Sequence, residues 1–594
     1  MRRPSLLPVV RSAACLAAVL LLAPAAGGQE VPEATFGESV AVDLMTVEVL
    51  VMDRRGDVVR DLGRADFRLF ENGRPVELTH FESPPAAAAG IVATGEGDAA
   101  APAPPVAESP GHFVVVVDNL HMGLVNRHAL FTELYRALDA ALRPGDRVMV
   151  VDYDGGTRVA LPFTDSRRDL IAALESQREG EARYAAWELE RRRMLDTLER
   201  MHQIEKRGEG GDLASAGCIS VGLMAWDYAR AQHSEVQQTI RALRNLVGTL
   251  AGVPGRKSLV YVSDGVPMSP GAVEVQYATD MCDGTAAREG IDHATKPMDS
   301  TTAKDTYWDP SHSRLEIVSL DTSNEWYLLA AQATAHRVAF YPIQSSGLAG
   351  GGFTSPINTS VRTTTLVQTM ARRDPQDTLV LLASETGGSA ILHAGDVGSA
   401  LGDALQAAQE TYVLGFTPVR GGEERRNSLR VEVARPGVEL RYPRSYYRKS
   451  AHGQMADAVV SSLLHGVEAN PLGIQVTLVE QAPGGGKDRL RVSLPLAGAT
   501  LLPAGEESQG LVTLFVAMRP TEGASSAVRQ TTVPVRVPGA SAATGSFVHD
   551  IGLALGPGRH QIAVGVYDEI GGVLSYVRRE VAIGGEARAI HPRG

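Results

Sequence analysis

Four aspartates stand at the ends of apolar runs, where a carboxylate could do chemistry. Asp118 closes the run FVVVVD, Asp152 and Asp154 close RVMVVDYD, and Asp264 closes KSLVYVSD. Apolar runs of this length are typical of buried parallel strands, which carry the residue at their carboxyl end to the rim of a sheet. Carboxylates at such a rim can ligate a hard divalent cation such as Mg²⁺ or take part in phosphoryl transfer.

The segment VVDYDGGTRV suggests the second chemistry, because it resembles the Asp-x-Asp-Gly-Thr nucleophile loop of haloacid dehalogenase-like phosphatases. That resemblance implies that Asp152 attacks phosphorus and Asp154 serves as acid and base. The extra Gly156 displaces Thr157 from its place in the motif. The alternative is a strand end with a glycine turn into the next strand, and the sequence favours this alternative.

The elements that would position these aspartates follow one alternating pattern of strands and helices. From residue 112 to about residue 418, short apolar runs alternate with helix-patterned segments. This alternation predicts an α/β fold with a doubly wound, mainly parallel sheet, in which ligands bind beyond the carboxyl ends of the strands where the strand order reverses.

Two segments interrupt this alternation of strands and helices. Residues of about 175–210 are densely charged and helix-forming, which predicts a helical arm over the rim or one more covering helix. Residues of about 268–313 are polar and aperiodic, which predicts a long loop after the strand that ends at Asp264.

The flanking regions are predicted to be β-rich. Residues 38–83 read as a small β module with Asn72-Gly73 at a hairpin tip, and residues 84–110 are a linker rich in Ala, Pro and Gly. Two strands close the α/β domain, for which we expect the range 111–448. Short alternating runs over 456–585 predict a β-sandwich.

Residues 1–28 have the pattern of a cleaved export signal, with arginines before an apolar run and small residues after it. Removing its three arginines takes the formal net charge from −12 to −15, which argues against nucleic acid as a partner. No other segment is long and apolar enough to cross a membrane. We therefore expect an exported protein that is periplasmic, displayed on the cell surface or secreted.

The order of features resembles the von Willebrand factor type A-related domain family typical of acidobacteria. The resemblance runs from about residue 40 to residue 448 through VEVLVMDRRGDVVRDLGRADFRLFENGRPVELTHF, FVVVVDNLH, GDRVMVVDYDG, GRKSLVYVSDG, AHRVAFYPIQSSGL, LASETGGSAIL and PGVELRYPRSYY. It implies a Rossmann-like, von Willebrand factor A-like sheet that recognises protein or envelope-polymer partners. It also implies a metal-ion-dependent adhesion site, in which Asp118 and Asp264 match the first and last aspartates.

The rest of that metal site departs from the family pattern. Leu120 and Met122 occupy the two serine positions and offer no oxygen ligand. The segment that should supply a threonine reads GGDLASAGCIS, which leaves Asp212 or Ser215 as stand-ins.

Two carboxylates that face each other without a cation repel, so another group must neutralise them. Further rim contributors are available in the sequence: Asn119, His121, Asp152 and Asp154. The metal site is therefore predicted to be degenerate, either rewired or without its usual Mg²⁺ or other divalent cation.

Cys218 and Cys282 are the cysteines that remain after signal removal. In an exported protein such a pair is expected to form a disulfide, here one that ties down the loop after Asp264; the alternative is two buried free thiols.

Together these features predict a non-enzymatic recognition or adhesion protein. The alternatives are a metal-dependent, phosphatase-like hydrolase at Asp152 and Asp154, and an inert structural component of the cell envelope.

Overall fold

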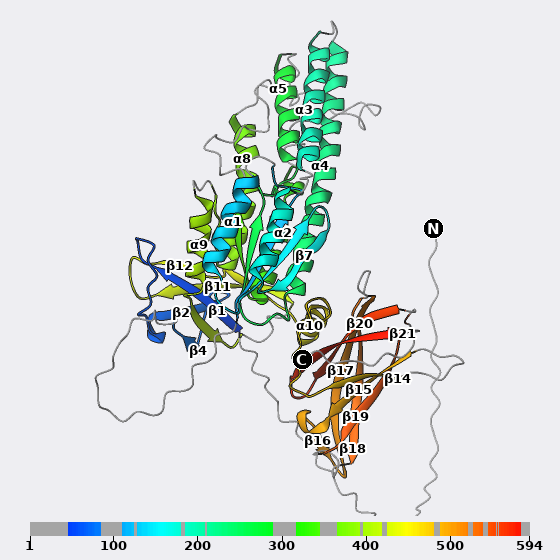
Figure 1. The fold of residues 1–594 in the computed structure, drawn as a ribbon. Helices are drawn as coiled ribbons and strands as arrows, with labels where there is room; N and C mark the ends of the chain where they lie inside the picture. The colour runs from blue at the N-terminus through cyan, green and yellow to red at the C-terminus, as the bar shows by residue number, and fades with distance from the viewer. Residues whose placement is uncertain are drawn as a thin grey trace, which may run out of the picture. The chain divides into compact units, whose positions relative to one another are not determined.

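The computed structural model describes residues 45–84, 110–123, 127–179, 184–207, 211–288, 317–344, 365–392, 396–418, 424–479, 488–520, 527–538, 544–553, 555 and 558–583. The predicted export signal and nearly all of the predicted linker lie outside these residues. In the described residues the chain has a mixed α/β fold, with one mainly parallel sheet and several antiparallel sheets (Figure 1).

The mainly parallel sheet contains the apolar runs that end in aspartate. Its strands are β5 (His112–Asp118), β6 (Arg147–Tyr153), β7 (Thr157–Thr164), β8 (Lys257–Val262) and β9 (Val338–Ile343), in the order β7-β6-β5-β8-β9. β6, β5, β8 and β9 are parallel to one another, and β7 is an antiparallel edge strand. Every residue of β5 is buried, as expected for a central strand covered on both faces.

Helices cover both faces of this sheet. They are α1 (Arg127–Ala141), α2 (Arg167–Glu179), α4 (Gly211–Thr249), α7 (Ser323–Ala335), α8 (Thr365–Thr386) and α9 (Val397–Ala408). α1, α2 and α9 pack on one face with Val115 and Val117 of β5, and α4, α7 and α8 pack on the other with Val114 and Val116. The alternating side chains of one strand therefore serve two separate cores. We call residues 112–408 the α/β domain.

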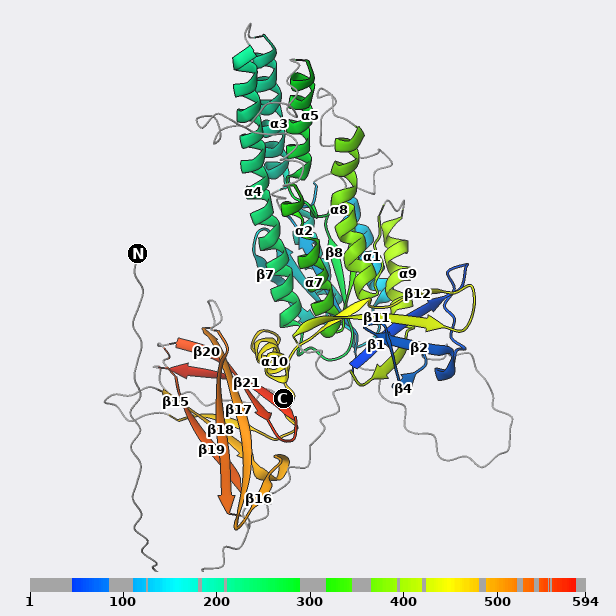
Figure 2. The ribbon, with the colours of Figure 1, turned by 180° about the vertical axis from the view of Figure 1, so that it is seen from behind.

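A helical arm extends beyond this sheet. α4 has 39 residues and is about 58 Å long, whereas a seven-residue strand spans only about 23 Å. The first half of α4 therefore continues past the carboxyl ends of the strands, where it packs with α3 (Tyr184–Arg207) and α5 (Ala272–Arg288) (Figures 1 and 2). The arm has its own core of Leu195, Leu198, Trp226 and Tyr277 among others.

The arm differs from its prediction in extent. Its expected range of about 175–210 covers α3 but misses α5, because residues 272–288 belong to the segment for which we expected a loop. Residues 289–316 of that segment lie outside the described residues.

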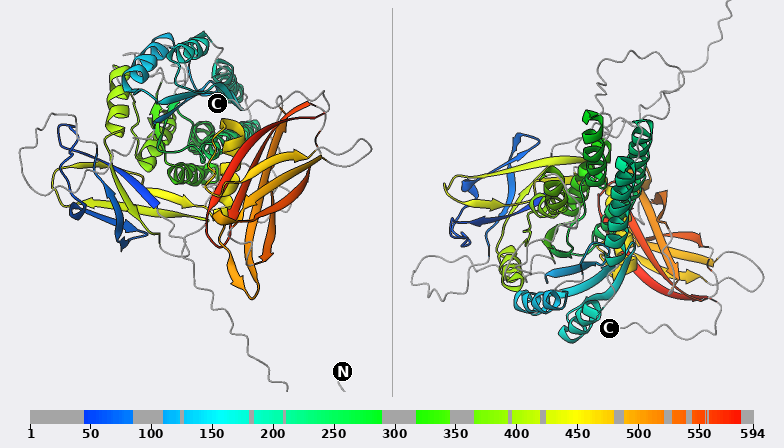
Figure 3. Two further views of the ribbon diagram at one scale, coloured as in Figure 1. Left: turned by 60° about the horizontal axis from the view of Figure 1, so that its bottom comes forward. Right: turned by 90° about the horizontal axis from the view of Figure 1, so that it is seen from above.

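The predicted N-terminal β module does not stand alone. Its strands are β1 (Met45–Met52), β2 (Phe67–Glu71), β3 (Arg74–Val76) and β4 (Leu78–Glu82), and a later segment supplies β10 (Tyr412–Phe416), β11 (Arg425–Val433), β12 (Glu439–Arg441) and β13 (Ser445–Arg448). The two sets interleave in sheets of order β12-β1-β10-β4 and β13-β11-β2-β3. Figure 3 shows the blue strands of the first set beside the yellow strands of the second.

We call these eight strands the split β domain. They enclose one core that draws on both sets, including Val49, Phe67, Tyr412 and Val431. The range of 111–448 expected for the α/β domain is therefore corrected, because its last four strands complete the N-terminal strands and the α/β domain is inserted between the two halves.

The C-terminal region forms two antiparallel sheets around one core. Its elements are α10 (Ala451–His465), β14 (Gln475–Val479), β15 (Asp488–Pro495), β16 (Leu502–Ala504), β17 (Glu507–Pro520), β18 (Arg529–Pro538), β19 (Ser546–Leu553), β20 (Gly558–Asp568) and β21 (Leu574–Ile583). One sheet has the order β14-β15-β19, and the other has the order β16-β17-β20-β21 with β18 also on β17. α10 packs through Met455, Val459 and Leu463 on Phe515 of β17.

Within the described residues, no helix is long and apolar enough to span a bilayer.

Candidate functional site

The candidate site lies where the strand order reverses. β5 is paired on one side with β6 and on the other with β8, so the loops that follow β5 and β8 leave the sheet at its switch point. In open α/β sheets ligands bind at this place, beyond the carboxyl ends of the strands. We call residues 118–123, 152–158 and 263–271 the binding rim.

Asp118 ends β5 and its carboxylate is enclosed by donors of the protein itself. Its Oδ1 accepts the backbone N–H groups of Leu120 at 3.2 Å and His121 at 3.0 Å. Its Oδ2 accepts the hydroxyl of Ser263 at 3.1 Å, the phenol of Tyr261, and Nδ1 of His121 at 3.0 Å. The side chain is 0% exposed, so these partners replace water completely.

His121 and Asp118 form a buried ion pair. Burial by itself raises the pKa of the Asp118 carboxyl, but the charge and hydrogen bond of His121 outweigh burial and lower that pKa. For His121, burial lowers the pKa, but the carboxylate of Asp118 and the charge of Glu235 raise it. When it is protonated, His121 supplies the positive charge that balances Asp118.

The residues around Asp118 do not fit a divalent cation. All of its hydrogen-bonding partners are donors, and the serine positions of the family motif hold Leu120 and Met122, of which Met122 is packed in the sheet core. A cation would have to displace these donors and share the site with a positive imidazolium. In the part of the chain that the structure describes, no group of three His, Cys, Asp or Glu side chains could hold a metal ion.

Asp264 joins the two loops of the switch point. Its backbone N–H donates to the carbonyl of His121 at 2.8 Å, and its Oδ2 accepts the N–H of Gly123 at 2.8 Å. The side chain is partly exposed. Asp264 therefore lies beside the loop that carries Asp118, as the family resemblance implies, but it binds that loop's backbone.

Asn119 and Asp152 belong to a second polar network at the rim. Asn119 donates its amide to Asp152 and accepts the guanidinium of Arg127 at 2.7 Å. Arg158 also binds Asp152, at 2.5 Å, and Arg127 donates from Nε to the carbonyl of Gln177 at 2.8 Å. These bonds link the ends of β5 and β6 to α1 and α2.

Asp154 lies in the hairpin that joins β6 to β7. Its backbone N–H donates to the carbonyl of Gly156 at 3.3 Å, and Gly155 has a φ of 103°, which favours glycine. Asp154 is exposed, whereas Asp152 is 7% exposed and held by Asn119 and Arg158. The segment DYDGGT is therefore a glycine turn between antiparallel strands, which is the alternative that the sequence favours.

Asp212 and Ser215 are the residues that the sequence offers in place of the missing threonine. Both lie at the start of α4, and their side chains lie outside the described residues. Val236, further along the same helix, packs in the core against the sheet. At 1.5 Å per residue, Asp212 is about 36 Å along the helix axis from Val236. The stand-ins belong to the arm.

The sequence does not single out several residues that build the rim. Tyr261 and Ser263 bind Asp118, and buried Thr239 of α4 lies 2.9 Å from the phenol oxygen of Tyr153. Ser263 could have been noticed because it immediately precedes Asp264. Tyr261 and Thr239 lie inside ordinary strand and helix patterns, which contain no signal for a polar contact.

The predicted disulfide falls on Cys218 in α4 and Cys282 in α5. These helices share the core of the arm. Both cysteine side chains lie outside the described residues, so the disulfide stays a prediction.

Comparisons with known proteins give weak likenesses. No protein-family model matches the chain, and no curated protein matches it. The chain is similar to a solved structure of three N-terminal domains of the type V pili tip protein Mfa5 from Porphyromonas gingivalis, with 10% identity, a TM-score of 0.23, and 65% of this chain and 68% of that chain covered. It is also similar to a von Willebrand factor type A structure from Catenulispora acidiphila, with 10% identity, a TM-score of 0.15, and 60% of this chain and 80% of that chain covered. Both TM-scores are below 0.5, so neither likeness establishes the fold of this chain.

Proposed function

We propose that this chain is an exported, non-enzymatic recognition protein. It binds a protein or an envelope polymer through the binding rim of a von Willebrand factor A-like domain whose metal-ion-dependent adhesion site is degenerate. The observation that carries the proposal is the hydrogen-bond network at the switch point. In this network His121 pairs with the carboxylate of Asp118, and Asp264 of the loop after β8 accepts the N–H of Gly123 in the loop after β5. A rim held in this way presents a fixed surface, which lowers the entropy cost of binding.

The position of the rim supports recognition. Mainly parallel sheets with helices on both faces bind their ligands at the switch point, and here three described segments from β5, β6 and β8 meet there. The rim also carries exposed charged side chains at Asp154 and Arg158, the second of which is paired with Asp152, and such a surface suits a polar partner. The export pattern of residues 1–28 favours a partner outside the cytoplasm.

A test of this proposal compares two charge-matched double variants. Asp154→Asn with Asp264→Asn removes two rim charges while keeping an oxygen acceptor for Gly123. Asp139→Asn with Asp227→Asn removes two charges from exposed positions on α1 and α4. Each fluorescently labelled protein is titrated onto isolated cell envelopes of the source cells. We expect saturable binding that the rim variant loses and the control variant keeps; equal binding by both variants contradicts the proposal.

The same preparations separate recognition from hydrolysis. If the Asp152 and Asp154 pair were a phosphatase centre, the wild-type chain would release phosphate from p-nitrophenyl phosphate, and Asp152→Asn would abolish that release. We expect no release above the buffer rate from either protein. An inert structural component would show neither envelope binding that depends on the rim nor phosphate release.

A further inference from the structure

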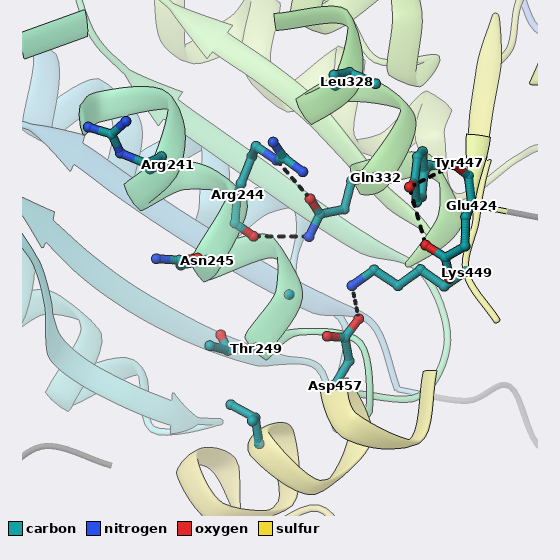
Figure 4. A pocket seen from close by; sticks show the side chains of 12 residues that line it. Arg241, Arg244, Asn245, Thr249, Leu328, Gln332, Glu424, Tyr447, Lys449 and Asp457 are labelled. Atoms are coloured by element: carbon teal, nitrogen blue, oxygen red, sulfur yellow. Dashed lines mark hydrogen bonds and ion pairs between the residues drawn. The ribbon is translucent and has the colours of Figure 1, made fainter. Parts of the chain in front are cut away.

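A polar pocket of about 600 Å³ lies at the other end of α4, away from the binding rim. α4 ends at Thr249, and β8 begins at Lys257, so this end of the helix lies near the amino-terminal edge of the sheet. The pocket is lined by side chains of α4, α7, the end of the split β domain and α10 (Figure 4). It is therefore a surface that the proposed rim function does not use.

Arg244 is held in the pocket by two hydrogen bonds to Gln332. Its Nε donates to Oε1 of Gln332 at 3.2 Å, while the amide of Gln332 donates back to the carbonyl of Arg244 at 3.1 Å. Gln332 is only 7% exposed, so its position is set by packing. These two reciprocal hydrogen bonds orient the guanidinium of Arg244 in the absence of a ligand. The two terminal nitrogens of that guanidinium form no hydrogen bond with any described residue.

The carboxylates of the pocket are already satisfied. Asp457 is bound by Lys449 and lies 3.2 Å from Nε2 of His336. Glu424 accepts the N–H of Ser450 at 2.8 Å, and this bond lowers the pKa of its carboxyl. Both side chains therefore stay ionised, with protein donors as their partners.

The unmatched charge in the pocket is positive. Three cations, Arg241, Arg244 and Lys449, stand against the two anions Glu424 and Asp457. Arg241 lies one turn before Arg244 on α4 and forms no ion pair with a described residue. The pocket therefore has one more positive than negative side chain, in a chain whose formal net charge is −12. This local excess of one positive charge would attract a ligand with one negative charge.

We propose that this pocket binds a carboxylate side chain of an acidic peptide segment on a protein partner. The free edge of a guanidinium matches a carboxylate through two parallel hydrogen bonds. A single net positive charge suits a monoanion, whereas a phosphate dianion would face Glu424 and Asp457. Leu328 and the ring of Tyr447 supply an apolar wall for side-chain methylenes, and the volume accommodates a small group rather than a whole domain.

Calorimetry on the full chain tests this assignment. The probe is an acetylated and amidated Gly-Gly-Glu-Gly peptide, which carries one carboxylate, and Gly-Gly-Gln-Gly is its uncharged match. We expect saturable binding of the glutamate peptide alone, weakened by added NaCl because the site is partly open to solvent. Arg244→Gln should lower the affinity at least about tenfold, since it removes charge-assisted hydrogen bonds.

Three further variants sharpen the test. Arg244→Lys keeps the positive charge but loses the planar guanidinium that can donate two parallel hydrogen bonds to a carboxylate, so it should also weaken binding of the glutamate peptide. Arg241→Gln should weaken binding less than Arg244→Gln. Arg230→Gln, on the exposed face of the same helix and paired with Asp227, is the control and should bind as the wild type does.

Several outcomes would overturn the proposal. These are no binding of the glutamate peptide, equal binding of the glutamine peptide, or binding that Arg244→Gln leaves unchanged while its thermal unfolding matches the wild type. Tighter binding of inorganic phosphate or of glucuronate than of the peptide would assign the pocket to a different ligand class and would also reject it. Because rim variants do not touch these residues, a negative result here leaves the rim proposal standing.

Discussion

At the scale of single residues, the Asp118–His121 pair is the feature that most defines the rim. A buried carboxylate is costly unless its charge is balanced and its oxygens are hydrogen-bonded, and Asp118 meets both conditions with groups of its own chain. The same pair makes the rim sensitive to pH, because the two groups depend on each other's charge.

The first prediction concerns pH. The pKa of His121 is raised above its ordinary 6.5, so its contribution to stability is complete below pH 6.5 and is lost as the pH rises through the folded-state value. The pKa of Asp118 is lowered below its ordinary 3.8, so its contribution is present above pH 3.8 and is lost as the pH falls through the folded-state value. The pair therefore stabilises the fold most between these two values.

Urea unfolding followed by tryptophan fluorescence checks this prediction. We expect His121→Gln to lower the free energy of unfolding by about 2 kcal/mol or more at pH 6. The difference between wild type and variant should shrink from pH 6 to pH 9. Parallel pH curves for the two proteins would show that the pair does not titrate as described.

The second prediction concerns metal. The donors around Asp118 leave no oxygen free for a cation, so titration of Mg²⁺, Mn²⁺ or Ca²⁺ should give no saturable heat and no rise in the unfolding temperature. Asp264→Ala is the matched variant. A saturable signal in the wild type that Asp264→Ala removes would restore the metal site implied by the family resemblance.

At the scale of elements, the helical arm contains a buried ion pair between two of its helices. Arg191 of α3 donates from Nε to Glu274 of α5 at 2.6 Å, and their side chains are 6% and 5% exposed. Leu198 and Trp226 pack in the same core. The pair links two helices that are separated in the sequence by α4 and β8.

The third prediction follows from that burial. Arg191→Met leaves Glu274 buried without its cation, which should destabilise the arm by about 3 kcal/mol or more. Arg191→Met with Glu274→Met replaces the pair by apolar groups and should lie within about 1 kcal/mol of the wild type. The stability of the arm in the single and the double variant is measured by hydrogen exchange of the α3 and α5 amides. Equal protection in the single variant and the wild type would show that the ion pair does not hold the arm together.

The arm also carries the disulfide prediction, and a mass measurement decides it. Exported protein alkylated without reductant should retain the mass of an unmodified Cys218–Cys282 bridge. Two alkylated thiols would reject the bridge.

At the scale of the whole molecule, the split β domain makes the two flanks of the α/β domain interdependent. β1 lies between β10 and β12, and Thr46 is paired with Gly415 across the length of the inserted domain. β2 pairs with β11 in the second sheet. Neither half has a closed core without the other.

The fourth prediction tests this interdependence. Deletion of residues 45–82 removes Val49 and Phe67 from the shared core and leaves β10 and β11 with unpaired edges. We expect residues 412–448 to lose hydrogen-exchange protection in that variant. Truncation after residue 450 is the control and should leave their protection intact. Unchanged protection in the deletion variant would contradict the shared domain.

The sequence by itself determined most of the strands and helices of the α/β domain and the residues at the strand ends, but not α5, for which a loop was expected. The runs that form β5, β6 and β8 are buried apart from Arg147 at the start of β6, and such runs carry their signal locally, in consecutive apolar side chains. The same local patterns predicted most of the helices between the strands and β strands in both flanks, whereas the pairing of Asp118 with Asp264 at one site was implied by the family resemblance.

Only the tertiary structure decided which groups meet. The strands of the N-terminal module find their partners in residues 412–448, and the phenol that binds Asp118 belongs to Tyr261, 143 residues away. Such contacts depend on which groups lie within a few ångströms in space. This holds for the charge that stabilises a buried ion, for the donors that hydrogen-bond a carboxylate, and for the strand that pairs with a sheet edge. A local pattern contains no such distances, so the contact of His121, Tyr261 and Ser263 with Asp118 could be seen only in the folded chain.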